Sequence, residues 1–521
     1  MTLIDRWLTA IPHPNPPPLG EGARPAHSVP HSAPPLFLLP PAGGGREGGQ
    51  RSTPTLRMTL GTLSLAAMLT GCATTSPDAA IEPVQQQLRQ HTGATLARWP
   101  DAQAPSTDTQ QRLRTLLAAP LTMDGAVEVA LLNHRGLQAA LSDLGVTQAE
   151  LSQATRLPNP GFTFSRTTSG EEIEWERGLH LNLGRLLLMP LTRTLENHRI
   201  AQQQAQTTQR VVTQIASVRR AWVEAVAAEE SLRYLRQVHD AAEAGAELAR
   251  RMAQAGNFNK LSLAREQSFE ADALLNVARG ERARDASRER LNRALGLWDD
   301  QLDYTLPERL PDLPAAPIEQ PDIERTALAQ RLDVQAAKTA TAQTARALGL
   351  TRTTRFLNVL EVGAARSVTN DGHRSRAWEV GLELPLFDWG DAKVARAEAT
   401  YTASLHRTAE IAIDARSEVR EAYRNWRHAW DIARHVQTAV VPLRQRIRDE
   451  NVLRYNGMLI GVFELLADAR AQIASVNSAI DARREFWLAD ADLQMAMLGR
   501  PTLSAGAAPA SSTAADAGGG H

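Results

Sequence analysis

The feature that constrains this chain most is an alternating segment that leads into a very long helical pattern. Apolar and polar residues alternate between Trp378 and Leu386, which predicts a strand with one apolar face and one polar face. A helical pattern then runs from Asp391, a residue suited to cap a helix, to about Tyr455. At about 1.5 Å per residue, such a helix is roughly 100 Å long. A strand of this kind suits the wall of a pore, and no ordinary globular core needs so long a rod.

The composition favours a helical, elongated body. Hydrophobic residues make up 43% of the 521 residues and aromatic residues only 5%, which suits helices built on Ala and Leu better than large β-sandwiches. The formal net charge of -1 gives no indication of nucleic-acid binding. Outside the N-terminal region no apolar run reaches the length of about 18 residues that a spanning helix needs. Membrane strands stay open, because alternating segments give a much weaker signal.

The N-terminal region is predicted to consist of an extension and a signal segment. Residues 1–57 are rich in Pro and Gly and have no periodic pattern, so we expect them to be disordered or to follow a start codon assigned too early. Residues 58–71 form an apolar run that ends at the only cysteine, Cys72. The letters LTGC at this point resemble a bacterial lipoprotein signal, in which the cysteine is lipidated and becomes the first mature residue. The alternative is a chance cysteine in a short apolar segment.

The rest of the chain is predicted to be an internal duplication. A polar, irregular tether at 72–119 precedes a first repeat at 120–297, and a proline-rich linker at 298–321 leads to a second repeat at 322–500. Residues 501–521 are expected to be a disordered tail. The two repeats share one order of elements, which is helix, strand, strand, long helix and return helix. The expected ranges are 123–155, 161–170, 178–184, 192–254 after Pro190, and 261–295, then 323–350, 355–369, 378–386, 391–455, and a return helix ending at 498.

Residue identity supports the duplication without reference to predicted elements. The segment GNFNKLSLAREQ at 256–267 and the segment GVFELLADARAQ at 461–472 agree at six of twelve positions, all at an offset of 205 residues. Both segments lie at the predicted turn between a long helix and its return helix. Such agreement is the signature of a tandem repeat.

The second long helix carries a heptad seam. Apolar residues recur in steps of three and four from Ala412 to Ile447, and many of them are Ala, so helix backbones can approach closely. A wall of nearly parallel helices fits this pattern better than a thick bundle. Pro442 removes one backbone hydrogen bond and clashes with the preceding turn, so we expect a kink or break there.

The predicted strands are too few to form a closed membrane structure within one chain. About eight strands are the smallest number whose barrel interior can be filled by side chains. The open edges of a four-stranded sheet would leave backbone groups unsatisfied in lipid. Several copies of the chain are therefore expected to share one barrel.

Five motifs together resemble the outer membrane factor family, the TolC-like efflux channels, and in particular its lipidated branch. They are LTGC at 69–72, LPNP at 157–160, GLELPLFDWGDAK at 381–393, RYNGMLIGVFELLADARAQ at 454–472, and the Leu-Gly endings at 295–296 and 498–499. The resemblance implies a mainly α fold with a membrane β-barrel. Three copies of the chain would form a homotrimer whose twelve strands make the barrel and whose long helices make a tunnel across the periplasm.

The same resemblance implies a function and partners. It implies a passive exit duct in the outer membrane, in contact with outer-membrane lipid and extending into the periplasm, with no cofactor and no enzymatic activity. A periplasmic adaptor protein would join it to an inner-membrane pump, commonly of the resistance-nodulation-division type. Cargo in the family is a drug, a metal ion or, for some members, a protein. Ala73 stands after Cys72 in place of the aspartate that retains lipoproteins at the inner membrane, which favours sorting to the outer membrane.

The resemblance also suggests a gate and docking sites at the two turns. Glu464 matches the family's first acidic position after Gly461, whereas Asp468 comes one residue late for the second, so its place in the gate stays open. A solvated helix face is the alternative for both carboxylates. The adaptor is expected to dock on the turns, for which a plain helix hairpin is the alternative. The docking residues are Gly256, Asn257, Phe258, Met458, Gly461 and Phe463.

Strand alternation assigns residues to the two sides of the barrel wall. If the apolar neighbours face lipid, then His180, Asn182, Glu379 and Glu383 face the lumen. The aromatic residues at the ends of the strands are candidates for an interfacial belt. They are Trp175, Trp378, Phe387 and Trp389.

The sequence contains no recognised catalytic or metal-binding motif. It has no Gly-rich phosphate loop, no HExxH and no CxxC pair, and His180, His373 and His521 have no partners at ligand spacing. The favoured interpretation is the outer-membrane exit duct of a tripartite efflux system for small molecules or metal ions. The alternatives are the outer-membrane component of a type I protein secretion system and a periplasmic coiled-coil scaffold without a pore.

The lipid anchor gives a direct prediction. Replacing the thiol in Cys72→Ser removes the only side chain in this segment that an acyl group could modify, so incorporation of labelled palmitate should be lost. Metabolic labelling of the full chain measures this. Labelling that persists in the Cys72→Ser variant would rule out Cys72 as the anchor.

Overall fold

The computed structural model describes residues 78–99, 105–317, 319–355, 360–382 and 386–501, all of which belong to one compact unit. Cys72, Glu383, residues 1–71 and residues 502–521 lie outside this description, as does the side chain of Phe463. Among the described residues, no helix is both long enough and apolar enough to cross a membrane.

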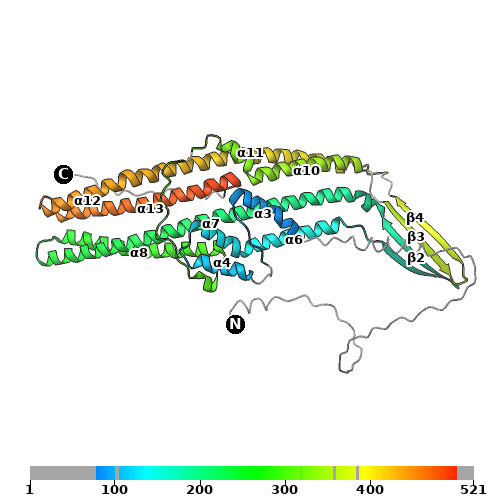
Figure 1. The fold of residues 1–521 in the computed structure, drawn as a ribbon, viewed down its shortest axis with the longest axis horizontal. Helices are drawn as coiled ribbons and strands as arrows, with labels where there is room; N and C mark the ends of the chain where they lie inside the picture. The colour runs from blue at the N-terminus through cyan, green and yellow to red at the C-terminus, as the bar shows by residue number, and fades with distance from the viewer. Residues whose placement is uncertain (1–77, 100–104, 318, 356–359, 383–385, 502–521) are drawn as a thin grey trace, which may run out of the picture. The chain divides into compact units, whose positions relative to one another are not determined.

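The same order of elements occurs twice along the chain, as the sequence predicts (Figure 1). Two helices precede a pair of strands in each half, and a long helix and a return helix follow. The first half contains α5 (Met123–Asn133), α6 (Arg135–Ala154), β1 (Gly161–Ser169), β2 (Glu172–Asn182), α7 (Leu183–Gln254) and α8 (Lys260–Leu295). The second contains α9 (Ile323–Gln330), α10 (Leu332–Thr354), β3 (Leu360–Thr369), β4 (Arg374–Leu382), α11 (Asp391–His435), α12 (Val441–Asn456) and α13 (Val462–Leu498).

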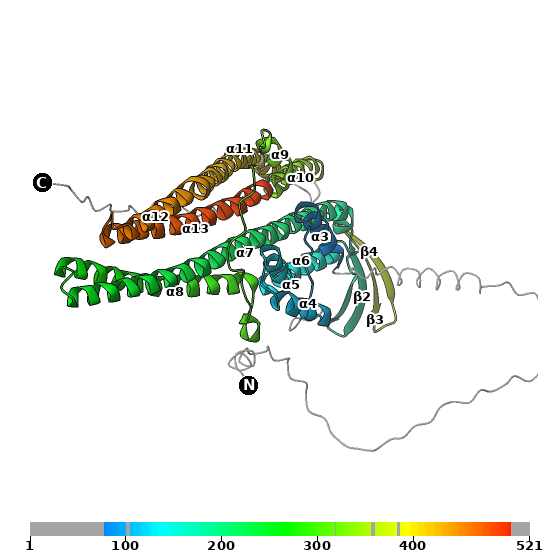
Figure 2. The same ribbon diagram turned by 60° about the vertical axis from the view of Figure 1, so that its left-hand side comes forward.

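The long helices form two hairpins. In both views α8 lies beside α7 and α13 lies beside α12, and the two turns are at the far end of the helices from the sheet (Figure 2). The chain enters α7 directly from β2 at Leu183, so the sheet and the first hairpin share one continuous backbone. The strands therefore fix where the long helices begin.

The helices predicted at 123–155 and 323–350 are each broken in two, which corrects both predictions. His134 and Arg331 leave the helical conformation, with ψ angles of 111° and 126°, and each lies between the two helices that precede the strands of its half. A single non-helical residue between two helices leaves the apolar periodicity on either side unchanged. The pattern alone therefore could not reveal these breaks.

Arg331 is the most buried charged residue among those described, with 1% of its surface exposed. Its guanidinium donates to both carboxylate oxygens of Asp333, at 3.0 and 2.7 Å, and to Glu418 Oε2 at 2.7 Å. It also donates to the backbone oxygen of Ala496 at 3.3 Å. These bonds join α10, α11 and α13. The break in the helix at Arg331 therefore places the guanidinium where three helices of the second half meet.

Two helix starts differ from the sequence prediction. Pro190 was expected at the start of the first long helix but lies inside α7, because the Asn182 side chain already caps the helix by accepting from the Arg185 N–H at 2.7 Å. Asp391 was expected as a cap, but Gly390 holds that position with a φ of 77°. Asp391 instead accepts a bond from Arg355 at 3.1 Å. A Cβ at position 390 would meet the Arg355 carbonyl at 2.9 Å, so both the backbone angle and the close approach favour glycine.

The heptad seam of α11 is buried in its middle part, as predicted. Val419, Ala422 and Trp426 are buried, and the Trp426 ring lies 6.1 Å from the ring of Phe486 on α13. The interruption expected near Pro442 is a π-helix at Val436–Val440, directly before α12. A π turn is a common way for a helix to accommodate such a residue without ending.

Residues 72–119 are not an irregular tether where the structure describes them. They contain α3 (Asp78–Thr92) and α4 (Thr107–Leu117). The Gln204 side chain on α7 donates to the Ala80 carbonyl of α3 at 3.0 Å, and Val84 and Leu88 of α3 are buried in the main core. Helix α3 is thus part of the folded body, which corrects this prediction.

The linker at 298–321 is mostly non-helical, as predicted, apart from one 3₁₀ turn at Asp299–Leu302. It nevertheless packs tightly, because Leu310 and Tyr304 are both buried. The Tyr304 hydroxyl donates to Asn292 Oδ1 at 2.8 Å. Burial raises the pKa of Tyr304 to about 12, against the lowering effect of Arg288.

The Arg331 cluster generates a stability prediction. Arg331→Ala removes the buried guanidinium shared by the half-buried Asp333 and Glu418 carboxylates and leaves Glu418 only the exposed Arg500, so the free energy of unfolding should fall by up to about 3–5 kcal/mol. Urea unfolding followed by far-UV circular dichroism measures the change. The matched control is Arg325→Ala, which removes an exposed ion pair to Asp322 and should cost at most about 1 kcal/mol. Equal losses in the two variants would contradict the role given to Arg331.

Candidate functional site

The four strands form one antiparallel sheet in the order β1-β2-β3-β4. The central pairing joins the two halves of the chain, with Leu179 of β2 opposite Ala364 of β3. Strands β1 and β4 lie at the two edges, and neither has a second partner strand among the described residues. The sheet thus ends in two rows of open backbone groups.

One face of this sheet is polar and acidic. Directly opposite residues share a face, so the register places His180 with Gly363 and Glu379, and Asn182 with Glu361. The Asn182 side chain donates to Glu361 Oε1 at 3.1 Å. The same alternation puts every described strand carboxylate on this face, namely Glu172, Glu174, Glu176, Glu361 and Glu379. The structure therefore brings three of the four predicted lumen residues together, while their contact with a lumen stays a prediction.

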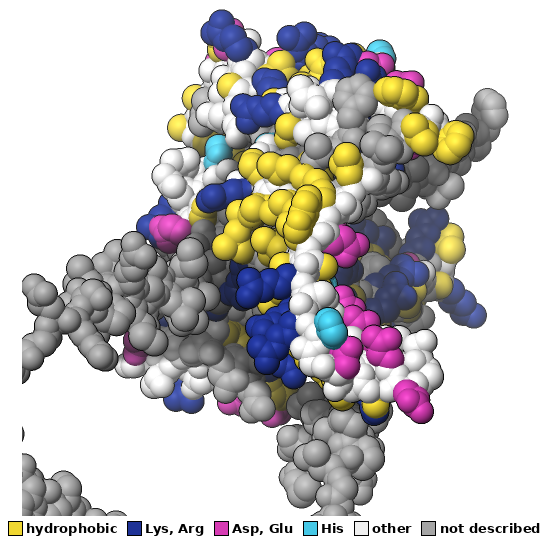
Figure 3. All heavy atoms as spheres, turned by 90° about the vertical axis from the view of Figure 1, so that its right-hand side faces the viewer, with side chains coloured by type: hydrophobic (Ala, Val, Ile, Leu, Met, Phe, Trp, Pro, Cys, Tyr) yellow, Lys and Arg dark blue, Asp and Glu magenta, His cyan; other side chains and the backbone are white. Residues whose placement is uncertain are grey.

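The other face is apolar and exposed. Phe162, Leu179, Ala364 and Trp378 lie opposite one another across all four strands, and 80% of the surface of Trp378 is exposed. Figure 3 looks onto the sheet end of the molecule and shows hydrophobic side chains gathered beside Lys and Arg side chains. The exposed apolar surface continues past β4, where the Phe387 side chain is fully exposed. Soluble monomers rarely expose large aromatic residues in such a row.

The first hairpin turn contains three of the predicted docking residues. Gly256 has a φ of 80° and ends α7, Asn257 is exposed and Phe258 is half-buried. The Asn259 side chain caps α8 by accepting from the Ser262 N–H at 2.8 Å. At its outer surface the polar residues Asn257, Asn259 and Lys260 are exposed beside the apolar Leu261.

The second hairpin turn is apolar and lies open to solvent. Met458 has a left-handed φ of 59°, and 93% of its surface is exposed, with the neighbouring Leu459 also exposed. Gly461 is the N-cap residue of α13 and makes no side-chain cap. The matched Gly256 instead follows the end of a helix, so the repeated motif preserves residue identity but not backbone role.

The two predicted gate carboxylates have different surroundings. Glu464 lies in the first turn of α13 and is exposed. Asp468, one turn further on, accepts a hydrogen bond from the buried Asn451 side chain of α12. Asp468 therefore ties the two helices of one hairpin together, while the Glu464 side chain remains at the surface.

A buried ion pair that the sequence analysis missed connects the two hairpins. Arg470 of α13 donates to Glu266 of α8 at 2.8 Å, and only 4% of the surface of Glu266 is exposed. The Arg470 guanidinium also lies 4.3 Å from the centre of the Phe269 ring. Arg470 belongs to the repeated motif, but residue 471, at the position matching Glu266, is alanine. The repeat therefore drew attention to Arg470 but gave no indication that Glu266 is its partner.

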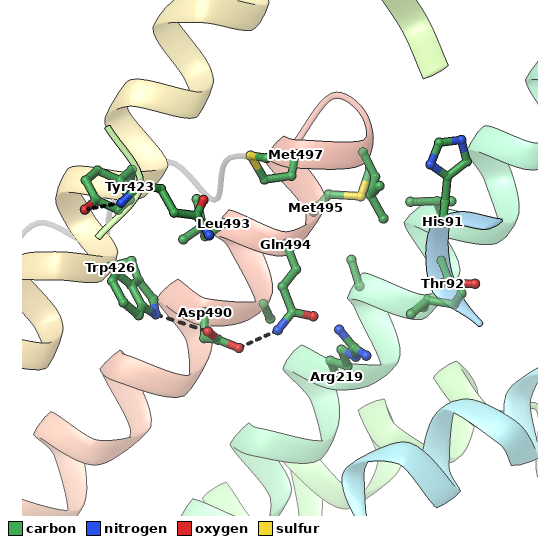
Figure 4. Close-up of a pocket in the computed structure, with 16 residues that line it drawn as sticks. His91, Thr92, Arg219, Tyr423, Trp426, Asp490, Leu493, Gln494, Met495 and Met497 are labelled. Carbon is green, nitrogen blue, oxygen red and sulfur yellow. Dashed lines mark hydrogen bonds between the residues drawn. The ribbon is translucent and has the colours of Figure 1, made fainter. Parts of the chain in front are cut away.

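A cavity of about 410 Å³ lies where α3 and α7 of the first half face α11 and α13 of the second (Figure 4). Asp490 accepts from Trp426 Nε1 at 3.1 Å and from Gln494 Nε2 at 2.6 Å. Burial raises the pKa of Asp490, opposed by its bond to Trp426 and by the charge of Arg219. The hydrogen bonds hold Asp490 of α13 against α11 within the second half. His91 of α3 and Arg219 of α7 line the cavity from the first half, so the cavity lies at the joint between the two halves.

The described residues contain no group of His, Cys, Asp and Glu side chains placed to hold a metal ion. The features available for function are the two-faced sheet and the two hairpin turns.

The fold is similar to solved membrane-channel structures, although no family model and no curated protein matches the sequence. The outer membrane channel CmeC of Campylobacter jejuni is 16% identical, with a TM-score of 0.61 over 72% of this chain and 85% of that chain. The open state of the outer membrane channel MtrE of Neisseria gonorrhoeae is 18% identical, with a TM-score of 0.60 over 72% and 89%. The outer membrane protein VceC of Vibrio cholerae is 15% identical, with a TM-score of 0.60 over 72% and 95%. The fold of the single chain that the motifs imply is thus confirmed, and this chain has the fold of the outer-membrane channels.

Proposed function

We propose that this chain is one subunit of an outer-membrane channel that serves as the exit duct of a tripartite efflux system. The observation that carries the proposal is the sheet, which has one apolar face, one acidic face and two open edges. An apolar face suits lipid and an acidic face suits a water-filled lumen. Small molecules or metal ions would pass by diffusion, because the described residues offer no site for catalysis or for coupling to an energy source.

The subunit works as part of a homotrimer. Backbone groups at an open sheet edge cost several kcal/mol each in hydrocarbon, so β1 and β4 must pair with strands of other copies. Three copies supply twelve strands, which exceeds the roughly eight needed for a filled barrel and leaves room for a passage. The resemblance of the sequence motifs to the outer membrane factor family implies the same number of copies.

The helical hairpins reach toward partners on the other side of the periplasm. A helix of 72 residues, such as α7, is roughly 110 Å long, which carries the turns far from the membrane. The exposed Met458 and Leu459 give a periplasmic adaptor an apolar surface to bind, and the adaptor connects the duct to an inner-membrane pump. A lipid on Cys72 anchors the chain to the same outer membrane.

Two other functions are the alternatives, and only the second of them fits fewer of the observations. The outer-membrane component of a type I secretion system uses a similar duct, and cargo size alone separates it from an efflux channel. A scaffold without a pore has no use for a sheet with an exposed aromatic row such as Phe162 to Trp378. The sheet therefore favours a channel over a scaffold.

Conductance in a planar bilayer tests the channel. The purified full chain should form a heat-sensitive trimer and open cation-preferring channels, because the acidic face lines the passage. Removing two opposed face carboxylates, in Glu361→Gln with Glu379→Gln, should roughly halve the preference for cations over anions. The matched control is Glu243→Gln with Glu229→Gln, which neutralises two carboxylates of α7 away from the sheet. No conductance from an assembled trimer would reject the proposal in favour of the scaffold.

The exposed carboxylate at the second turn gives a prediction about gating. Three copies of Glu464 at a closed tip would attract divalent cations, so Glu464→Gln should weaken block by such cations added from the tip side by about tenfold. Single-channel recordings over a range of divalent concentrations measure the block. Asp468→Asn should change it less, because Asp468 is held by Asn451 within the hairpin. Equal block in wild type and Glu464→Gln would remove Glu464 from the gate.

A further inference from the structure

Five arginines lie on the apolar face of the sheet, toward the strand turns. Arg177, Arg366 and Arg376 are directly opposite one another on β2, β3 and β4. In the next row, Arg166 and Arg374 lie on the two edge strands. All five side chains are exposed. The alternation that identified the lumen residues also places these arginines, but their opposition across three strands follows only from the register.

This cluster has no counter-charge within the described chain. None of the five side chains forms an ion pair or a side-chain hydrogen bond with another described residue. The strand carboxylates all lie on the opposite face, as described above. Like charges directly opposite each other on neighbouring strands destabilise a sheet. The arrangement therefore calls for anions from outside the chain.

The position of the cluster indicates where those anions come from. The row of Arg376 follows immediately after the row of Trp378 and lies six residues from Leu382, which is about 20 Å along the strand. The apolar band of a membrane barrel is about 25 Å tall, and the exposed Phe387 extends this band past the other end of β4. The arginines thus lie at the border of the band, on the side of the strand turns, where lipid headgroups begin.

We propose that this arginine row binds the phosphate groups of lipids in the leaflet next to the strand turns. The inference rests on the proposed function, since it places the apolar face against lipid. A guanidinium offers a planar fork of N–H donors that matches two phosphate oxygens at once. Three forks in a row on each subunit provide a strip of phosphate sites around the barrel. Bound headgroups neutralise the opposed charges and hold neighbouring strands together.

Lipid retention in native mass spectrometry tests the proposal. The purified full chain is mixed with dioleoylphosphatidic acid or with dioleoylphosphatidylcholine, and the lipid retained on each oligomer is measured. Wild type should retain the phosphate monoester at least about tenfold more than the zwitterionic lipid. Arg177→Gln with Arg366→Gln and Arg376→Gln should abolish this difference. The matched control removes three exposed helix arginines, in Arg282→Gln with Arg407→Gln and Arg434→Gln, and should retain it.

Several results would overturn the proposal. They are equal retention of the two lipids by wild type, equal retention by the triple variant and wild type, and displacement of bound lipid by millimolar inorganic phosphate, which would indicate a free-anion site. If the triple variant does not assemble, Arg366→Gln alone removes the central charge and should still lower retention about threefold. Conductance in phosphatidylcholine bilayers is recorded in parallel. Channels without lipid selectivity would reject this inference and leave the proposed function intact, whereas an assembled protein without conductance would reject the function itself.

Discussion

The open backbone groups along β1 and β4 govern the organisation of the whole chain. Under the proposed function the apolar face of the sheet meets lipid, where each unsatisfied N–H or C=O would cost several kcal/mol. The cost disappears only if the sheet continues into further strands, and this chain has no more to offer among its described residues. Because β2 runs into α7 without a loop, whatever brings the edges of several copies together also brings their long helices side by side. In the proposed assembly, the barrel and the helical wall would both follow from one pairing requirement.

Within one copy, the two halves are held together by contacts that the repeat does not duplicate. Backbone pairing of β2 with β3 joins them in the sheet, the Glu266–Arg470 ion pair joins them near the turns, and the Asp490 cavity lies between. Arg331 organises the second half alone, whereas His134 at the matched position carries no such set of partners. The two halves thus share one order of elements, and residues at individual positions make each half distinct.

The sequence predicted what depends on periodicity, and it failed where a single residue decides. The alternation of polar and apolar residues was enough to assign His180 and Glu379 to one face of the sheet and Trp378 to the other. The residue identities between 256–267 and 461–472 were enough to find the repeat. The breaks at His134 and Arg331 were missed because one non-helical residue does not alter the surrounding pattern. The predicted helix starts at Asp391 and near Pro190 were wrong. Gly390 is the N-cap because its left-handed backbone favours glycine, and Asn182 is the N-cap because α7 follows β2 directly. Residues 78–117 seemed irregular because their helices are short and mostly polar, and only packing against α7 reveals their apolar side.

The π-helix at Val436–Val440 makes the two arms of the subunit mechanically unequal. Helix α7 is a single α-helix of 72 residues, but its counterpart contains one widened turn whose hydrogen bonds are poorly matched to those on either side. A load applied evenly at both tips would therefore bend the second arm at that turn before it bent the first. Movement would be concentrated in the α12–α13 hairpin, which carries Met458 and Glu464, while the α7–α8 hairpin would stay rigid.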